Sequence, residues 1–461
     1  EEEHRPGNVL DHQFIETYTH GFDEFAAVLK AASWDEILEQ SGVSREAIEE
    51  AAKIFIESER TIVCWAMGLT QHKNAVANIQ EIVNLMLMRG QIGKPGAGLC
   101  PVRGHSNVQG DRTMGIWERP VDGFLDKLGT EFGFEPPRRH GLDTVRAIQA
   151  MHDGKARVFF ALGGNFLSAT PDTELTATAL RHCRLTVQVS TKLNRAHVVT
   201  GEQALILPCL GRTETDIQAT GPQFVTTENS MAVVQASRGF LSPASDQLLS
   251  EPAIVGRLAQ KTLGNRSAVK WQLLVDDYDR IRDHIGRVVP GFDNFNMRVR
   301  RPGGFYLPNS ARERVFRTST DRAMFTVHDL PKHDLQPDQY LMMTIRTHDQ
   351  FNTSIYGLDD RYRGVYNGRR VVFLNRDDIA EANLSEGQLV DLFSHFEGET
   401  RVAHRFTVVP YSIPRRCAAT YFPETNVLVP LGSVADKSNT PVSKSVVISI
   451  RPSLNKQDSL P

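Results

Sequence analysis

Short apolar segments that alternate with amphipathic helices are the feature that most constrains the fold of this chain. Residues 61–67, 157–162, 185–189 and 204–207 are largely apolar runs, and each ends at a glycine, serine or proline. Such runs are typical of strands buried on both faces of a parallel sheet. Helical patterns lie between them, as at residues 74–89. Strands that alternate with helices form βαβ units, so the pattern predicts two α/β lobes with doubly wound, mainly parallel sheets.

Polar or glycine-bearing turns follow three of these strands. They are Gly68–His72, Gly163–Asn165 and Ser190–Thr191. Ligands of open α/β sheets bind outside the carboxyl ends of the strands, so we expect ligand contacts at these turns. Backbone N–H groups and the amide of Gln71 can cradle a phosphate or a heterocycle. An ordinary strand–helix turn is an equally good interpretation of the first of them.

The pattern changes after residue 338. Six strand candidates lie at residues 340–345, 370–374, 388–393, 405–409, 418–421 and 445–450, and one short helix lies near 377–382. This arrangement predicts an all-β unit, most simply a barrel. We divide the chain into an α/β lobe (1–105, the back half of a larger domain), a second α/β lobe (106–265), an irregular connection between domains (266–336) and a barrel domain (337–461).

Residues 90–115 contain seven glycines and two prolines in 26 positions. Glycine at this density indicates close approach of backbone to a ligand, and a long loop inside a compact chain is commonly functional. Arg103 lies in this loop, where its guanidinium can present a fork to an anion. The alternative is a structural arginine that donates to loop carbonyls. We prefer a structural role for Arg112, which follows Asp111.

Two polar segments predict a further ligand face on the barrel. Residues 344–352 follow a buried strand, and residues 424–426 and 443–445 are similarly polar. Lys444 stands at the start of a β-run. A lysine there commonly protects a sheet edge, and a phosphate contact is the alternative.

The composition excludes several classes of protein. The 461 residues include 40% hydrophobic and 23% charged residues with a net charge of −3, so neither disorder nor a polyanion-binding field is indicated. The sequence contains no Ser-His-Asp order, H-E-x-x-H, P-loop or G-x-G-x-x-G signature. No apolar run is long enough to span a membrane. We therefore expect no common hydrolase, kinase, classical NAD enzyme or membrane-spanning protein.

The five cysteines are scattered and show no C-x-x-C spacing. This usage indicates reduced thiols and a cytoplasmic location, without an iron–sulfur or zinc motif in these residues. His72, Cys100 and His105 match no common metal template, so we expect polar or packing roles and no metal ligand among them. The start of the sequence has neither a signal segment nor an initiator methionine, and we expect the true N-terminus to lie upstream.

Several of these segments together resemble the molybdopterin-dependent oxidoreductase family, in its formate dehydrogenase-like branch. They are Met67–His72, Gly90–Gly98, Val102–Gly110, Gly163–Asn165 with Thr170–Asp172, and Ile345–His348. The ending, from Tyr421–Asn426 through Thr440–Lys444, is more similar to uncharacterised paralogues linked to acid tolerance than to true formate dehydrogenases. The resemblance covers essentially the whole chain, as the C-terminal two thirds of such a protein.

The resemblance implies a bis(molybdopterin guanine dinucleotide) cofactor that holds one molybdenum or tungsten, two α/β domains and a double-psi β-barrel. It places these residues against the cofactor: Gly68, Gln71, His72, Gly104, Gly163, Gly164, Asn165, Ser190, Arg346, Thr347, His348, Asn352, Asn426 and Lys444. Arg103 falls where formate dehydrogenases place an arginine beside the metal, to hold the substrate carboxylate during a two-electron oxidation.

The implied function is oxidation of formate or a similar small substrate by a catalytic subunit that passes electrons to an acceptor protein or subunit. The resemblance places the protein ligand of the metal, and any iron–sulfur cluster, upstream of residue 1, so this chain alone is expected to be inactive. His105-Ser106 replaces a slightly different pair in the formate enzymes, so the substrate can differ. One alternative is a non-catalytic scaffold or subunit with the same fold. The other is an unrelated nucleotide-binding α/β protein with an appended barrel.

Overall fold

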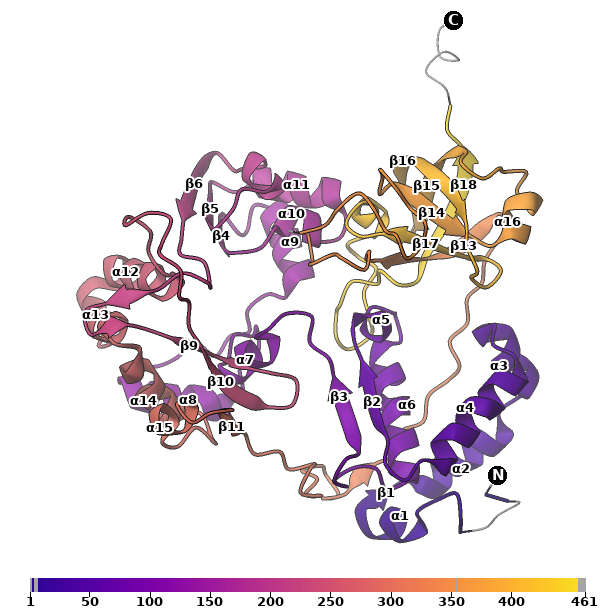
Figure 1. The fold of residues 1–461 in the computed structure, drawn as a ribbon, viewed down its shortest axis with the longest axis horizontal. Coiled ribbons are helices and arrows are strands. Elements are labelled where there is room, and N and C mark those ends of the chain that lie inside the picture. Colours follow the sequence, from indigo (N-terminus) through magenta and orange to yellow (C-terminus); the bar gives the residue numbers. More distant parts are fainter. Residues whose placement is uncertain (1, 4–6, 354, 455–461) are drawn as a thin grey trace, which may run out of the picture. The chain divides into compact units, whose positions relative to one another are not determined.

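The computed structural model describes residues 2–3, 7–353 and 355–454, and the chain divides into two compact units. The first unit comprises Glu1–Cys100, Leu167–Thr176 and Asn309–Pro461. The second comprises Pro101–Phe166 and Ala177–Pro308. Figure 1 labels the elements of both units. None of the helices in the described part of the chain combines the length and the apolar character that crossing a bilayer requires.

The first unit begins with helices and short strands. They are α1 (His12–Tyr18), β1 (Thr19–His20), α2 (Phe22–Ala31), α3 (Trp34–Ser41), α4 (Arg45–Glu57), β2 (Ile62–Trp65), α5 (Met67–Thr70), α6 (Ala75–Met88) and β3 (Gly98–Pro101). Ser44 caps α4, because its hydroxyl accepts a hydrogen bond from the N–H of Ala47 at 3.3 Å. Gly90 follows α6 with φ +57°, and the Asp11 carboxylate fills the space that a Cβ would need.

The C-terminal part of this unit is a closed six-stranded barrel. Its elements are β13 (Gln339–Ile345), β14 (Val371–Leu374), α16 (Arg376–Glu381), β15 (Leu389–Phe396), β16 (Glu399–Pro410), β17 (Cys417–Tyr421), η3 (Asn426–Leu428) and β18 (Val446–Pro452). The strand order is β13-β17-β14-β16-β15-β18, with β13/β17 and β14/β16 parallel and the other pairs antiparallel. The predicted barrel, its six strands and its one short helix are confirmed.

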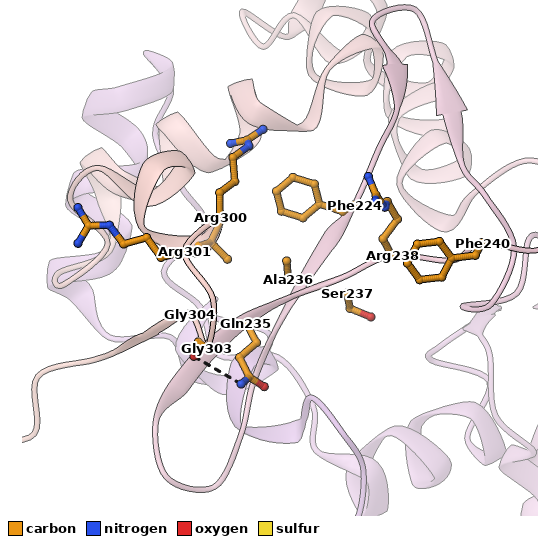
Figure 2. A pocket seen from close by; sticks show the side chains of 11 residues that line it. Phe224, Gln235, Ala236, Ser237, Arg238, Phe240, Arg300, Arg301, Gly303 and Gly304 are labelled. Carbon is orange, nitrogen blue, oxygen red and sulfur yellow. Dashed lines mark hydrogen bonds between the residues drawn. The ribbon is translucent and has the colours of Figure 1, made fainter.

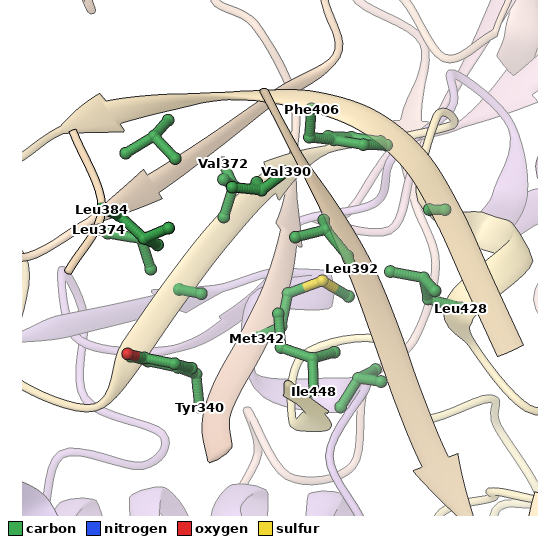
Figure 3. Packing of buried hydrophobic residues seen from close by; sticks show 14 of the residues in the cluster. Tyr340, Met342, Val372, Leu374, Leu384, Val390, Leu392, Phe406, Leu428 and Ile448 are labelled. Carbon is green, nitrogen blue, oxygen red and sulfur yellow. The ribbon is translucent and has the colours of Figure 1, made fainter. Parts of the chain in front are cut away.

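Alternating apolar residues of the strands fill the barrel. Figure 3 shows Met342, Val372, Leu392 and Ile448 directed into one cluster, and each is completely buried. Burial of one such side chain contributes about 1.5–3 kcal/mol. This core fixes the two segments that carry predicted ligand residues, the loop after β13 and the segment before β18.

The second unit contains helices, a parallel sheet and short antiparallel strands. Its elements are α7 (Val108–Thr113), α8 (Asp122–Phe132), α9 (Thr144–His152), β4 (Val158–Leu162), α10 (Phe166–Ala169), α11 (Thr173–Arg181), β5 (Leu185–Ser190), η1 (Arg195–Val198), β6 (Gln203–Pro208), β7 (Ile217–Gln218), β8 (Gly221–Pro222), β9 (Val225–Glu228), β10 (Val233–Ser237), α12 (Glu251–Leu263), η2 (Gly264–Arg266), α13 (Trp271–Asp276), α14 (Tyr278–Val288), α15 (Phe295–Val299) and β11 (Phe305–Tyr306). Strands β4, β5 and β6 pair in parallel, in that order. The mixed α/β fold is thus confirmed, and α10 and α11 cross the boundary between the units.

Two details of the sequence interpretation were wrong. The strands were expected to be buried on both faces, yet in β4 Val158, Phe160 and Leu162 are exposed by 60%, 38% and 46%. The neighbouring β5 is largely buried on both faces, whereas alternate residues of β4 are exposed. The expected irregular connection also contains α13, α14 and α15. The helical period was obscured there, because α14 buries Arg282 as well as apolar residues.

Candidate functional site

Lys444 lies at the centre of a polar cluster in the first unit, in the segment before β18. Its ammonium group donates to the carbonyl oxygen of Thr344 and, at 3.4 Å, to the hydroxyl of that residue. The backbone N–H of Lys444 donates to the carbonyl of Gln71 at 3.1 Å. The hydroxyl of Ser443 donates to Gln71 Oε1 at 2.7 Å. These bonds bring the predicted residues Gln71 and Lys444 together, although 372 positions separate Gln71 from Ser443.

The surroundings of Lys444 favour an anion. Burial, with a smaller effect of the nearby Arg346, lowers the pKa of Lys444 to about 8. Burial also lowers the pKa of Arg346 and of His72. In the described part of the chain, neither Lys444 nor Arg346 forms an ion pair with a carboxylate. A cationic group removed from water without such a partner is stabilised by a bound anion. The turn beside it is open, because a Cβ built on Gly68 meets no atom within 4 Å.

The loop after β13 is organised around the buried carboxylate of Asp360. Arg363 Nη1 donates to Asp360 Oδ2 at 2.6 Å, the hydroxyl of Tyr421 donates to the same oxygen at 2.9 Å, and His348 Nδ1 lies 3.4 Å from Oδ1. Burial raises the pKa of Asp360, but these hydrogen bonds outweigh it and the pKa is lowered. The ring of His348 lies 4.2 Å from that of Tyr362. Asp360 thereby orients the predicted residue His348.

Thr347 and Asn352 lie in the same loop and are held by polar side chains. Arg369 donates to Glu424 Oε1 at 2.7 Å and to the hydroxyl of Thr347 at 3.3 Å. Gln350 accepts from the N–H of Thr347 at 3.1 Å and donates to the carbonyl of Asn352 at 2.7 Å. Both predicted residues therefore belong to the internal network of this loop, and their contact with a cofactor stays a prediction.

Asn426 is 3% exposed and fastens residues 167–176 to the barrel within the first unit. Its side-chain amide donates to the carbonyls of Ser168 at 2.8 Å and Thr170 at 3.2 Å. Its own carbonyl accepts from the N–H of Asp172 at 2.9 Å. These bonds give Asn426 a structural role that the sequence interpretation did not include.

The predicted residues of the second unit stand at the carboxyl ends of β4 and β5. Gly163 and Gly164 have φ of +74° and +77°, and a Cβ at Gly164 would meet no atom within 4 Å. Asn165 is 8% exposed, and its Oδ1 is buried without a hydrogen-bond partner among the residues that the structure describes. The hydroxyl of Ser190 donates to the carbonyl of Lys192 at 2.7 Å. Buried acceptors are normally paired, so an unpaired one beside open backbone favours a ligand that carries an N–H donor.

Arg103 and Gly104 are exposed in the loop before α7. Arg103 donates to Gln109 Oε1 from Nε at 3.0 Å and from Nη2 at 2.7 Å. Its backbone N–H donates to the hydroxyl of Ser230 at 3.0 Å. The guanidinium is therefore held by one neutral side chain and keeps Nη1 without a partner among the described residues. An arginine held in this way can bind a carboxylate.

The sequence interpretation missed two residues, Asp360 and Glu228, that help to position these side chains. Asp360 orients His348, and Glu228 contacts the loop that bears Arg103, because its N–H donates to Asn107 Oδ1 at 3.0 Å. No local pattern marks either residue, since the partners of Glu228 precede it by more than 100 positions. Among the residues that the structure describes, no group of three or more His, Cys, Asp or Glu side chains is placed to hold a metal ion.

Two families match this chain. Residues 26–199 match the family described as molybdopterin oxidoreductase, and residues 340–447 match the molydopterin dinucleotide binding domain. The second match coincides with the barrel that carries Arg346, His348 and Lys444. The fold and these matches define a protein with a molybdopterin oxidoreductase region followed by a dinucleotide-binding barrel.

Known relatives match almost the whole chain. An uncharacterised oxidoreductase of Mycobacterium tuberculosis is 52% identical over 457 residues, and the protein YdeP of Escherichia coli is 44% identical over 452 residues. These matches cover 98% and 97% of this chain and 59% of each relative. The chain thus spans about three fifths of the length of these relatives. The alpha subunit of an F420-dependent formate dehydrogenase from Methanocaldococcus jannaschii is 26% identical over 65% of the chain and 43% of its own length.

Among solved structures, acetylene hydratase from Pelobacter acetylenicus has a similar fold. The TM-score is 0.64 with 13% sequence identity, and the match covers 96% of this chain and 68% of the hydratase. The chain belongs to the molybdopterin oxidoreductase family.

Proposed function

We propose that this chain is part of the catalytic subunit of an oxidoreductase that carries a bis(molybdopterin guanine dinucleotide) molybdenum or tungsten centre. Its reaction is the two-electron oxidation of formate or a similar small acid, with electrons passed to an acceptor protein or subunit. The proposed contacts of the cofactor are Gly68, Gln71, His72, Gly104, Gly163, Gly164, Asn165, Ser190, Arg346, Thr347, His348, Asn352, Asn426 and Lys444. The boundaries at residues 105, 265 and 336 are proposed with it, with 266–336 as a segment that contains helices α13, α14 and α15.

The donor chemistry of these residues fits such a cofactor. Lys444 and Arg346 are cationic groups without a carboxylate partner in the described part of the first unit, which suits a phosphate-bearing ligand. Asn165 offers an unpaired buried acceptor, which suits a ring with N–H donors such as guanine. Each observation concerns one unit by itself, and both agree with the match of residues 340–447 to a dinucleotide-binding domain.

The proposed substrate is inferred from Arg103. Its guanidinium presents a planar, positively charged fork that suits a carboxylate. Gln109 fixes the orientation of that fork, so less rotamer entropy is lost when a substrate binds. The metal–pterin group, when bound, supplies the two-electron redox chemistry. The task of this chain is then to bind the acid and orient it.

Substitution of Arg103 in the full-length enzyme tests this role. We expect Arg103→Ala to lower kcat/KM for formate by roughly a hundredfold. This factor corresponds to the free energy of a charge-assisted hydrogen bond to a carboxylate. Arg103→Lys should recover only part of it, because the ammonium group lacks the fork. Arg139→Ala, at an exposed position of the same unit, is the control. Unchanged turnover in Arg103→Ala would refute the proposed role.

Metal and pterin analysis of the full-length protein separates the enzyme from a scaffold with the same fold. We expect close to one molybdenum or tungsten per chain, together with fluorescent pterin on denaturation. A protein without metal after expression in a host that makes the cofactor would instead support the scaffold. Release of guanine nucleotide without pterin would indicate a simple nucleotide-binding protein.

A further inference from the structure

The second unit contains a cavity of about 840 Å³ between the end of β10 and the turn that follows α15. Its side chains come from Phe224, Arg238 and Phe240 on one side and from Arg300 and Arg301 on the other (Figure 2). Among the described residues, none of those that line the cavity is acidic. The lining therefore excludes a cation as the ligand and favours an anion.

The arginines of the cavity differ in their partners. Arg300 Nη2 lies 2.8 Å and 2.7 Å from the two carboxylate oxygens of Asp279, so Arg300 is ion-paired, although the same carboxylate also pairs with Arg282. Arg238 and Arg301 are exposed and form no ion pair within the described residues. Figure 2 shows Arg238 beside Phe240, whereas the side chain of Arg301 extends away from the other labelled side chains. Arg238 is therefore the unpaired guanidinium available to a phosphate beside Phe240, and Arg301 adds positive charge to the lining.

Aromatic rings accompany these charges. Phe240 is 79% exposed, and the guanidinium carbon of Arg238 lies 5.3 Å from its ring centroid. The ring of Phe224 has the guanidinium carbon of Arg300 at 5.1 Å. An exposed phenyl ring beside a guanidinium offers a stacking surface for a planar ligand. Gly303 leaves room for its approach, because φ is +83° and a Cβ there would meet no atom within 4 Å.

We propose that this cavity binds a nucleotide-type ligand, that is, a planar heterocycle that carries phosphate. The heterocycle stacks on Phe240, one phosphate pairs with Arg238, and the remaining negative charge lies toward Arg301. The site is separate from the proposed cofactor contacts, since none of those residues lines the cavity. It also does not depend on the proposed redox function.

Binding of ADP to the full-length, cofactor-loaded protein tests the site, because the nucleotide sites of the cofactor are then filled. In calorimetric titrations we expect ADP to bind about tenfold more tightly than inorganic phosphate, the contribution of stacking one base on an aromatic ring. Failure of ADP to bind would overturn the proposal. Binding of a glutamate-rich peptide in place of ADP would overturn it too and would identify the cavity as a docking surface for an acidic protein.

Single substitutions assign the binding to this cavity. We expect Arg238→Ala to lower the affinity for ADP by about tenfold, since a charge-assisted hydrogen bond is lost. Arg301→Ala should lower the affinity less. Phe240→Ala should lower the affinity for ADP but leave the affinity for inorganic phosphate unchanged. Arg139→Ala is the matched control, and all four positions are exposed, so the melting temperature should not move. Equal affinity for ADP in the wild type and in the cavity variants would refute the site.

Discussion

Gln109 Oε1 accepts two hydrogen bonds from the guanidinium of Arg103, at 3.0 Å from Nε and 2.7 Å from Nη2. The loop that bears both residues is fastened to the β9–β10 hairpin, because Arg103 N–H donates to Ser230 and Glu228 N–H donates to Asn107. A glycine-rich loop thus gains a defined position from bonds to a distant hairpin. The orientation of Arg103 depends on Gln109 and on this attachment.

Replacement of Gln109 should separate the effect of the orientation of the Arg103 guanidinium from the effect of its charge. In the full-length enzyme we expect Gln109→Ala to raise KM for formate by about tenfold, less than the effect of Arg103→Ala, because the guanidinium remains but loses two hydrogen bonds. Steady-state kinetics measure this. Gln149→Ala is the control, since Gln149 is a glutamine on α9 whose amide nitrogen donates to Asp153 at the end of that helix. Wild-type kinetics in Gln109→Ala would show that the fork needs no such support.

Glu228 is 5% exposed, and its Oε2 has no hydrogen-bond partner. Burial raises its pKa, although hydrogen bonds with Thr113 and Gln109 and the charge of Arg103 oppose the change. A raised pKa means that the folded state binds the proton more tightly. This group's contribution to stability is therefore present below the ordinary value of 4.5 and is lost as the pH rises through the folded pKa.

We accordingly expect Glu228→Gln to increase the free energy of unfolding at neutral pH by roughly 1 kcal/mol, because the desolvation cost of a buried carboxylate is removed. The difference should shrink as the pH falls below 4.5, where the wild-type carboxyl becomes protonated in both states. Urea unfolding at several pH values measures it. Glu202→Gln, at an exposed position, should show no such dependence. A Glu228→Gln variant that is less stable at every pH would contradict this expectation.

How far the sequence predicts the structure depends on the range of the interactions. The barrel strands could be predicted, because each is a short apolar run. The alternation of residues along the strand determines which side chains face the core, as for Met342 in β13. Exposure of Phe160 in β4 could not be predicted, because burial of a strand face depends on the layer that covers it. The same holds for the site. Turn residues such as Gln71 follow from local pattern, but Glu228 acts across more than 100 positions and leaves no local signal.

Asn426 offers a test of structural against ligand-binding roles. Its amide donates to the carbonyls of Ser168 and Thr170, so Asn426→Ala should lower the free energy of unfolding by about 2 kcal/mol, since two buried acceptors lose their donor. Asn426→Asp should cost at least as much, because a carboxylate would face those carbonyls. Both effects should appear in the cofactor-free protein when unfolding is followed by circular dichroism. Destabilisation only in the cofactor-loaded protein would assign the residue to the ligand instead.

From the lowered pKa of Lys444 we predict how the free energy of unfolding changes with pH. Burial lowers its pKa to about 8 from the ordinary 10.5, so the unfolded chain binds the proton more tightly. Because the unfolded state carries more protons between these values, the contribution of Lys444 to stability rises with pH across that interval. Across the full interval between the two pKa values, the contribution of Lys444 to the free energy of unfolding changes by roughly 3 kcal/mol. At neutral pH the folded protein holds a buried charge that an apolar residue would not have.

Lys444→Met should therefore stabilise the cofactor-free protein at about pH 7, and the gain should decline toward about pH 10 as the wild-type lysine loses its proton. Lys53→Met, on the exposed face of α4, is the matched control and should show no such decline. Inorganic pyrophosphate should reduce the difference between Lys444→Met and wild type at neutral pH, because a bound anion stabilises the charged ammonium group. A pH-independent difference would mean that Lys444 keeps its ordinary pKa. An undiminished difference with pyrophosphate bound would place the phosphate-binding group elsewhere.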